Sequence, residues 1–69
     1  MQAKEIVGAN IRAERKRIGI TQEALADRSA MHPVEIGRLE RGTRDLRVST
    51  LAKIARGLGV PASELLKGV

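Results

Sequence analysis

The sequence has 69 residues, thirteen of them Lys or Arg against eight Asp or Glu, and it contains no Cys, Phe, Trp or Tyr. This length predicts one small domain over residues 1–69 and is too short for a barrel, a kinase or a dinucleotide-binding fold with a substrate domain. A chain without cysteine has no disulfide or thiolate zinc site, and one histidine cannot build a multi-histidine metal site, so we expect no metal and no cofactor.

The hydrophobic pattern predicts an all-α fold, because no alternating β-branched run is bounded by hairpin turns. A first helix from Ala3 to Arg17 has its apolar residues close to a 3.6-residue period and is stopped by Gly19. Thr21 is a good N-cap for a second helix, from Gln22 to Arg28.

Three further helices follow in the second half of the chain. One begins near Pro33, whose fixed φ suits a first helical position, and ends at Gly42. After a polar, basic loop, Ser49 is predicted to cap a fourth helix that Gly59 closes. A last short helix begins near Pro61 or Ala62 and includes Leu65 and Leu66.

Residues 21–41 have the features of a helix-turn-helix, in which the second of two short helices can enter a DNA major groove. Ala26 supplies the small residue that the crossing of the helices requires. The wedge between them is predicted to be filled by Leu25, Met31, Ile36 and Leu39.

Three segments resemble the Cro and phage-repressor (XRE-type) helix-turn-helix family: residues 19–26, residues 36–42, and Leu58-Gly59-Val60 followed by Glu64-Leu65-Leu66. The resemblance covers nearly the whole chain and implies a compact five-helix domain whose third helix reads base edges. The loop from Arg41 to Leu51 is most similar to small stand-alone regulators such as the controller proteins of restriction–modification systems. One departure lies in the turn, which in the family usually has glycine and here has Ala30; a positive φ there would cost roughly 1 kcal/mol.

The resemblance also assigns roles along the recognition helix. Pro33, Val34, Glu35 and Arg38 align with its base-facing side. Arg38 can bond bidentately to guanine O6 and N7, Glu35 can accept from cytosine N4, and Val34 and Pro33 can contact a thymine methyl. The alternatives are a phosphate contact or an intrahelical pair with Glu35 for Arg38, and a helix-starting role for Pro33.

Contacts to the DNA backbone are expected from residues around that helix. Gln22 occupies the position where the family contacts a phosphate, and His32 is interpreted as a cap or a phosphate contact. The full set of expected phosphate contacts is Lys16, Arg17, Thr21, Gln22, His32, Arg41, Thr43, Arg44 and Arg47. The alternative interpretation is a helix cap for Thr21 and His32. For Gln22, for the loop residues and for Lys16 and Arg17 it is a solvated, non-contacting side chain.

Two further features concern the fold and its assembly. Arg15 and Glu40 match a charge pair that the family keeps between the first and third helices, which we interpret as structural. Leu65, Leu66 and Val69 are predicted to form a dimer interface, with one of the two leucines filling the core.

The net charge of +5 points to a polyanionic partner, and the absence of aromatic residues argues against single-stranded nucleic acid. The predicted function is a sequence-specific regulator of transcription that binds double-stranded DNA as a homodimer on a pseudo-palindromic operator. The alternatives are an antitoxin that autoregulates its operon and a non-specific nucleic-acid-binding domain.

No catalytic constellation is found, so we predict no enzyme. RNA polymerase is a candidate partner, no small-molecule ligand or membrane is expected, and the predicted location is the cytoplasm, at the nucleoid.

Overall fold

The computed structural model describes residues 1–69 as five helices without a strand, which confirms the all-α prediction. Their bounds are α1 (Ala3–Arg17), α2 (Gln22–Arg28), α3 (Pro33–Glu40), α4 (Val48–Leu58) and α5 (Ala62–Leu65). The first two helices have the predicted limits, α3 begins where proline was expected to start it, and α5 follows Pro61.

Local hydrogen bonds explain why the helices begin where they do. The Thr21 hydroxyl accepts a hydrogen bond from the Ala24 backbone amide at 3.0 Å, so this residue is the N-cap that the sequence predicts. The Glu5 carboxylate reaches back to the Gln2 amide at 2.9 Å at the start of α1. Glu35 makes the same contact with the amide of His32, at 3.3 Å, at the start of α3.

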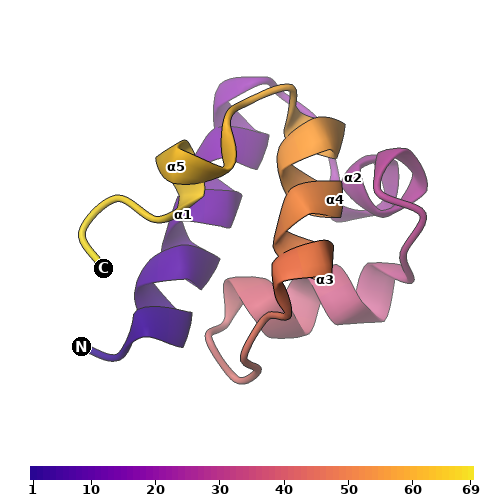
Figure 1. Ribbon diagram of the computed structural model, residues 1–69. Coiled ribbons are helices and arrows are strands. Elements are labelled where there is room, and N and C mark those ends of the chain that lie inside the picture. Colours follow the sequence, from indigo (N-terminus) through magenta and orange to yellow (C-terminus); the bar gives the residue numbers. More distant parts are fainter.

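The helices pack around one aliphatic core, and α3 lies across one end of the bundle (Figure 1). In this view α1 and α4 stand above α3, and α5 lies beside α1, so that both chain ends are on the same side. The side chains buried most completely are Ile11, Leu25, Ile36, Ile54 and Leu65. Every helix contributes one of them, so the orientation of α3 depends on all the others.

The start of α4 differs from the prediction. Its N-cap is Arg47, and Ser49 is the second residue of the helix rather than its cap. The physical reason is hydrophobic: Leu46 and Leu51 stand immediately before the cap and at the fourth helical position, and both pack against the core. This staple fixes where the chain enters the helix without a side-chain cap. The predicted end of α3 is also slightly late, because Glu40 is its last residue and Arg41 is its C-cap.

The turn between α2 and α3 has a positive φ at Ala30, the position where glycine was expected. Ala30 has φ of +53°, the left-handed region in which a Cβ atom is strained. The amide of Met31 donates to the Ala26 carbonyl at 2.9 Å and closes the turn. The turn therefore forms although the backbone of Ala30 is locally strained.

None of the five helices combines the length and the apolar character that crossing a membrane would require.

Candidate nucleic-acid interface

Glu40, the last residue of α3, is at the centre of a buried polar network. The Arg15 guanidinium donates from Nε and Nη2 to the two Glu40 carboxylate oxygens, at 2.7 and 3.0 Å. Its Nη1 donates to the Ile20 carbonyl at 2.9 Å, and the Gln22 side-chain amide donates to Glu40 at 3.1 Å. The predicted Arg15–Glu40 pair is thus present, and it joins the ends of α1 and α3 to the start of α2.

The electrostatics of this pair follow from its geometry and burial. The Arg15 and Glu40 side chains are only 12% and 3% exposed, so water screens their attraction weakly. The hydrogen bonds and charge of Glu40 hold the pKa of Arg15 above its ordinary value, although burial works in the opposite direction. Arg15 therefore stays charged at any pH at which the protein would be studied, and Glu40 keeps its counterion.

An open groove of about 530 Å³ lies next to this network, between the start of α2 and the exposed side of α3. Donors line it from several elements: the Thr21 hydroxyl, the Gln22 amide and the guanidinium groups of Arg15 and Arg41. Glu23 is the one acidic residue in the lining. Gly37 gives the Arg41 side chain room in this groove, because a Cβ there would lie 3.3 Å from the guanidinium. Such a set of hydrogen-bond donors suits phosphate oxygens.

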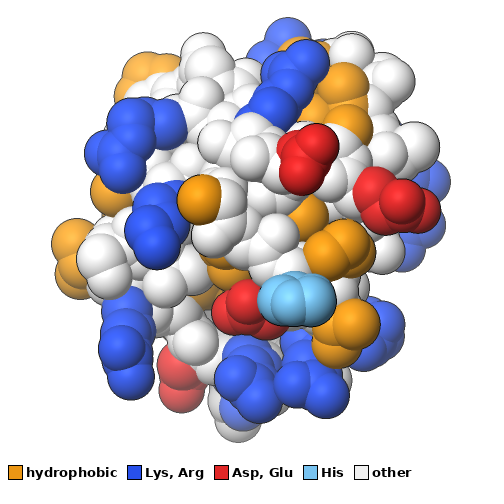
Figure 2. Space-filling model, turned by 90° about the vertical axis from the view of Figure 1, so that its right-hand side faces the viewer, with side chains coloured by type: hydrophobic (Ala, Val, Ile, Leu, Met, Phe, Trp, Pro, Cys, Tyr) orange, Lys and Arg blue, Asp and Glu red, His pale blue; other side chains and the backbone are white.

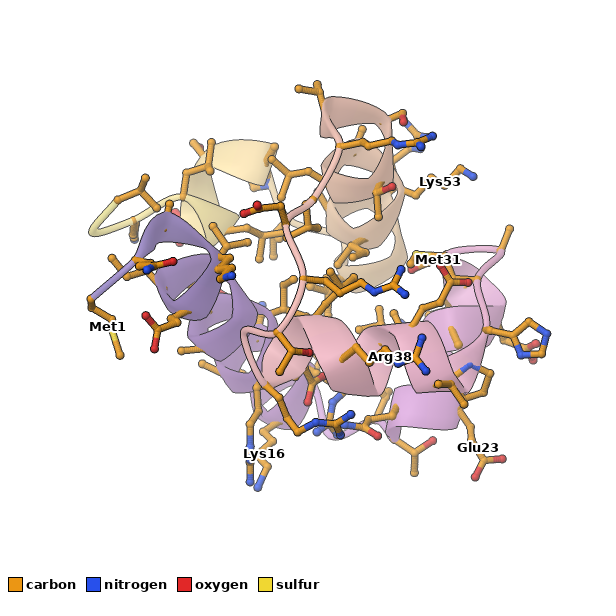
Figure 3. The ribbon with its side chains drawn as sticks, turned by 90° about the horizontal axis from the view of Figure 1, so that it is seen from below. Met1, Lys16, Glu23, Met31, Arg38 and Lys53 are labelled. Atoms are coloured by element: carbon orange, nitrogen blue, oxygen red, sulfur yellow. The ribbon has the colours of Figure 1, made fainter.

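The outward side of α3 has exposed side chains of the kinds that read base edges. Val34 is 59% exposed, and Pro33 and Arg38 are also exposed. Figure 3 shows Arg38 on the side of α3 that faces the viewer, with Lys16 and Glu23 at the ends of the neighbouring helices. No ion pair joins Arg38 to Glu35, whose carboxylate binds the His32 amide instead.

The loop after α3 supplies the other expected phosphate contacts. Thr43 closes the helix, because its hydroxyl donates to the Arg38 carbonyl at 3.0 Å. The side chains of Arg41, Arg44 and Arg47 are exposed. Figure 2 shows several Lys and Arg side chains at the lower end of the molecule, the end at which α3 lies in Figure 1, and others along the left edge and at the top. These three exposed arginines thus lie in the segment that joins α3 to α4.

Three expected site residues have partners or surroundings that the sequence did not reveal. Gln22 belongs to the Glu40 network, with one of its two amide hydrogens engaged there. Arg17 pairs with Glu14 on its own helix at 2.5 Å. Leu65 is fully buried in the core, so its assignment to a dimer interface is wrong, whereas Leu66 and Val69 are 44% and 64% exposed. The register of α5 decides this, since adjacent helical residues point to different sides.

Sequence reasoning missed Gly8, which positions the recognition helix. A Cβ at this residue would lie 2.1 Å from the Leu39 carbonyl oxygen, so α1 and the end of α3 touch backbone to backbone. Glycine weakens a helix by about 1 kcal/mol relative to alanine. A glycine in the apolar stripe of a long helix was therefore the available signal for close packing.

The comparisons with known proteins agree with this geometry. A helix-turn-helix family model matches residues 11–65, so the chain belongs to that family. The control protein C.SmaI of Serratia marcescens is 38% identical over 66 residues, which are 96% of this chain and 79% of that protein. The restriction-modification controller protein C.AhdI of Aeromonas hydrophila superposes with a TM-score of 0.87 at 31% identity, covering 90% and 94% of the two chains. The clp gene regulator ClgR of C. glutamicum gives 0.92 at 30% identity, over 96% and 86%.

The fold and these similarities together define the class of the protein. It is a DNA-binding transcriptional regulator of the helix-turn-helix family, in which α2 and α3 form the motif. The predicted resemblance, fold class and general function are confirmed. The roles of single residues stay predictions.

Proposed function

We propose that this regulator recognises a specific double-stranded DNA sequence by inserting α3 into the major groove. The observation that carries the proposal is the exposed side of α3, where a free guanidinium and two exposed apolar side chains stand beside a donor-lined groove. Arg38 reads a guanine, and Val34 with Pro33 contacts a thymine methyl. Glu35, whose carboxylate binds the His32 amide at the start of α3, lies three residues before Arg38. It accepts a hydrogen bond from a cytosine amino group.

Phosphate contacts surround this base-reading surface. Gln22 and Thr21 bind the backbone from the groove, with Arg41 beside them and Lys16 at the end of α1. Arg44, Arg47, Thr43 and His32 extend the contact along the loop and at the start of α3. Arg17 joins them only by leaving its bond to Glu14, so we rank it as a weaker contact.

We also propose that two copies bind DNA together through an apolar hollow of about 280 Å³. Its aliphatic lining comes from α1, α4, the loop before α4 and the chain end, and includes Val48 and Val69, which are 84% and 64% exposed. Lys4, Asp45 and Arg47 also line it, so a two-fold axis can pair the Asp45 of one copy with a cation of the other. A second copy therefore complements this surface in both polarity and charge.

The similarity to controller proteins of restriction–modification systems supports a role in regulating such genes, with RNA polymerase as the machinery acted upon. We expect no small-molecule ligand and no enzymatic activity, and we place the protein in the cytoplasm at the nucleoid.

Footprinting of the DNA upstream of the protein's own gene tests the proposal. The expected result is a symmetrical protected site with half-sites about one helical turn apart, because two recognition helices on a two-fold axis have that spacing. Affinity for it should fall steeply with salt as phosphate contacts release counterions. Equal affinity for this site and a scrambled duplex at ~150 mM salt would contradict sequence-specific recognition.

A further inference from the structure

Three cations surround a small hollow where the end of α2 meets the outer side of α4. The hollow has a volume of about 220 Å³ and is lined by Arg28, Ser29, Ala30, Lys53 and Arg56. The three basic side chains are exposed, and no carboxylate pairs with any of them. We call this set of Arg28, Lys53 and Arg56 the lateral basic patch.

Close helix packing brings these cations together. Gly57 lies against Ser29, and a Cβ on the glycine would be 2.5 Å from the serine hydroxyl oxygen. Ser29 is only 3% exposed, and its hydroxyl has no hydrogen-bond partner. A buried hydroxyl without a partner costs free energy, as does a set of like charges without a counterion. The fold thus keeps a positively charged depression that nothing in this chain neutralises.

The one polar contact within the lateral basic patch leaves most of its donors free. Arg28 donates from Nη1 to the Gly57 carbonyl at 3.5 Å, a long bond that holds the side chain against α4. The other guanidinium hydrogens of Arg28 are free, and Lys53 and Arg56 make no side-chain hydrogen bond. Two guanidinium groups and an ammonium group around one hollow are a strong arrangement for carboxylates.

The lateral basic patch is separate from the proposed DNA-binding face. In Figure 3 Lys53 lies on the opposite side of α3 from Lys16 and Glu23. The seven residues of α2 span about 10 Å, and the DNA-side groove lies at its start, whereas the patch lies at its end. Phosphates held by the α2 start therefore leave the patch open. On the loop side, the hollow that Arg44 and Arg47 line shares no residue with the patch.

We propose that the lateral basic patch binds an acidic segment of another protein while the regulator occupies DNA. A hollow of this size accepts one or two carboxylate side chains. Paired Asp or Glu residues on a helix or loop would meet the two arginines bidentately. The proposal goes beyond DNA recognition, and its test has a separate readout for each surface.

The experiment titrates the full-length chain, isotopically labelled and saturated with a duplex of about two helical turns, with a short poly-glutamate peptide. The duplex covers the other basic surface. We expect amide chemical-shift changes at residues 28–30 and 53–57. Lys53→Glu and Arg56→Glu should each weaken peptide binding on the order of tenfold, because an attraction becomes a repulsion. Arg12→Glu is the matched control, since Arg12 is an exposed cation of α1 outside the patch, and it should change peptide affinity little.

The affinity of each variant for the duplex alone completes the design. If Lys53→Glu or Arg56→Glu weakens duplex binding more than Arg12→Glu does, the patch is a DNA contact and the proposal is wrong. Equal loss of peptide affinity in all three variants would show general charge attraction, and it would also overturn the proposal. Loss of sequence specificity, by contrast, would be seen in the duplex measurement and would count against the proposed function alone.

Discussion

The arginines of this protein differ in what their guanidinium groups already bind. Arg15 uses three nitrogens on Glu40 and the Ile20 carbonyl and is nearly buried, so its main contribution is to hold α3. Arg38 is exposed and has no side-chain bond, so its donors are available to a base. Arg44 is exposed in the loop after α3.

Replacing Arg38 and Arg44 separately should distinguish base reading from backbone binding. Arg38→Ala should cost about 1–3 kcal/mol of binding free energy at the operator and flatten discrimination at one base pair. Arg44→Ala should weaken all sequences by a similar factor and reduce the salt slope by about 1. Duplex titrations at several salt concentrations measure both quantities. If the two variants behave alike, Arg38 is a phosphate contact.

The buried pair predicts a loss of stability that does not depend on DNA. Arg15→Gln or Glu40→Gln should each lower the free energy of unfolding by ~3–5 kcal/mol, because the remaining charge is buried without a counterion. Replacing both should cost less than the sum of the single losses. Denaturant titrations of the four proteins in a double-mutant cycle measure this coupling, and a value under ~0.5 kcal/mol would mean that the residues act independently.

At the scale of the elements, the turn between α2 and α3 sets the angle of the motif. Ala30 has φ of +53° and is exposed, so its Cβ contributes strain and little packing. Met31, next to it, packs against the core and thereby holds the turn in place. The strain is therefore a local cost that the surrounding core can support.

We expect Ala30→Gly to stabilise the protein by about 0.5–1 kcal/mol, because glycine adopts a positive φ without steric strain. The matched control is Ala13→Gly, at an exposed position inside α1, which should destabilise by about 1 kcal/mol. Thermal unfolding followed by circular dichroism checks both signs. A lower melting temperature for Ala30→Gly would contradict this prediction. It would mean that alanine stabilises the protein more, by reducing the conformational entropy of the unfolded chain, than its backbone strain destabilises it.

For the whole molecule, the apolar hollow predicts how the protein associates. Val48 is 84% exposed and lies at the start of α4, away from the core, so Val48→Lys should leave the monomer fold intact and prevent dimerisation. Val34→Lys, which changes an exposed valine of α3 outside the hollow, should leave self-association unchanged. Sedimentation of the free variants measures the effect.

The same dimer should be weak without DNA, because an interface built on this hollow is expected to bury under ~1,200 Å². Sedimentation with a full operator should then show two protomers per duplex for the unchanged protein. A saturated complex with a single protomer would remove the dimer and, with it, the expectation of a palindromic site.

The sequence by itself determined the helices and the motif, because these depend on local chemistry. Apolar spacing located α1 to α4, although the start of α4 and the end of α3 were placed two residues late. Thr21 and Pro33 marked helix starts, and Ala26 with Leu25 marked the crossing of α2 and α3. The Arg15–Glu40 pair also came from the sequence, through the family resemblance. All of these signals lie within a few residues of one another or repeat a known pattern.

Only the tertiary structure decided which side chains are free and which are already bound. Gln22 and Glu40 are eighteen residues apart, and only the packing of α2 against α3 brings them into contact. Leu65 and Leu66 are neighbouring residues of the same type, and the register of α5 buries the first and exposes the second. Close approaches at Gly8 and Gly57 bring α3 against α1 and place the lateral basic patch. A glycine inside a helix signals close packing, but it does not tell which distant residue it meets.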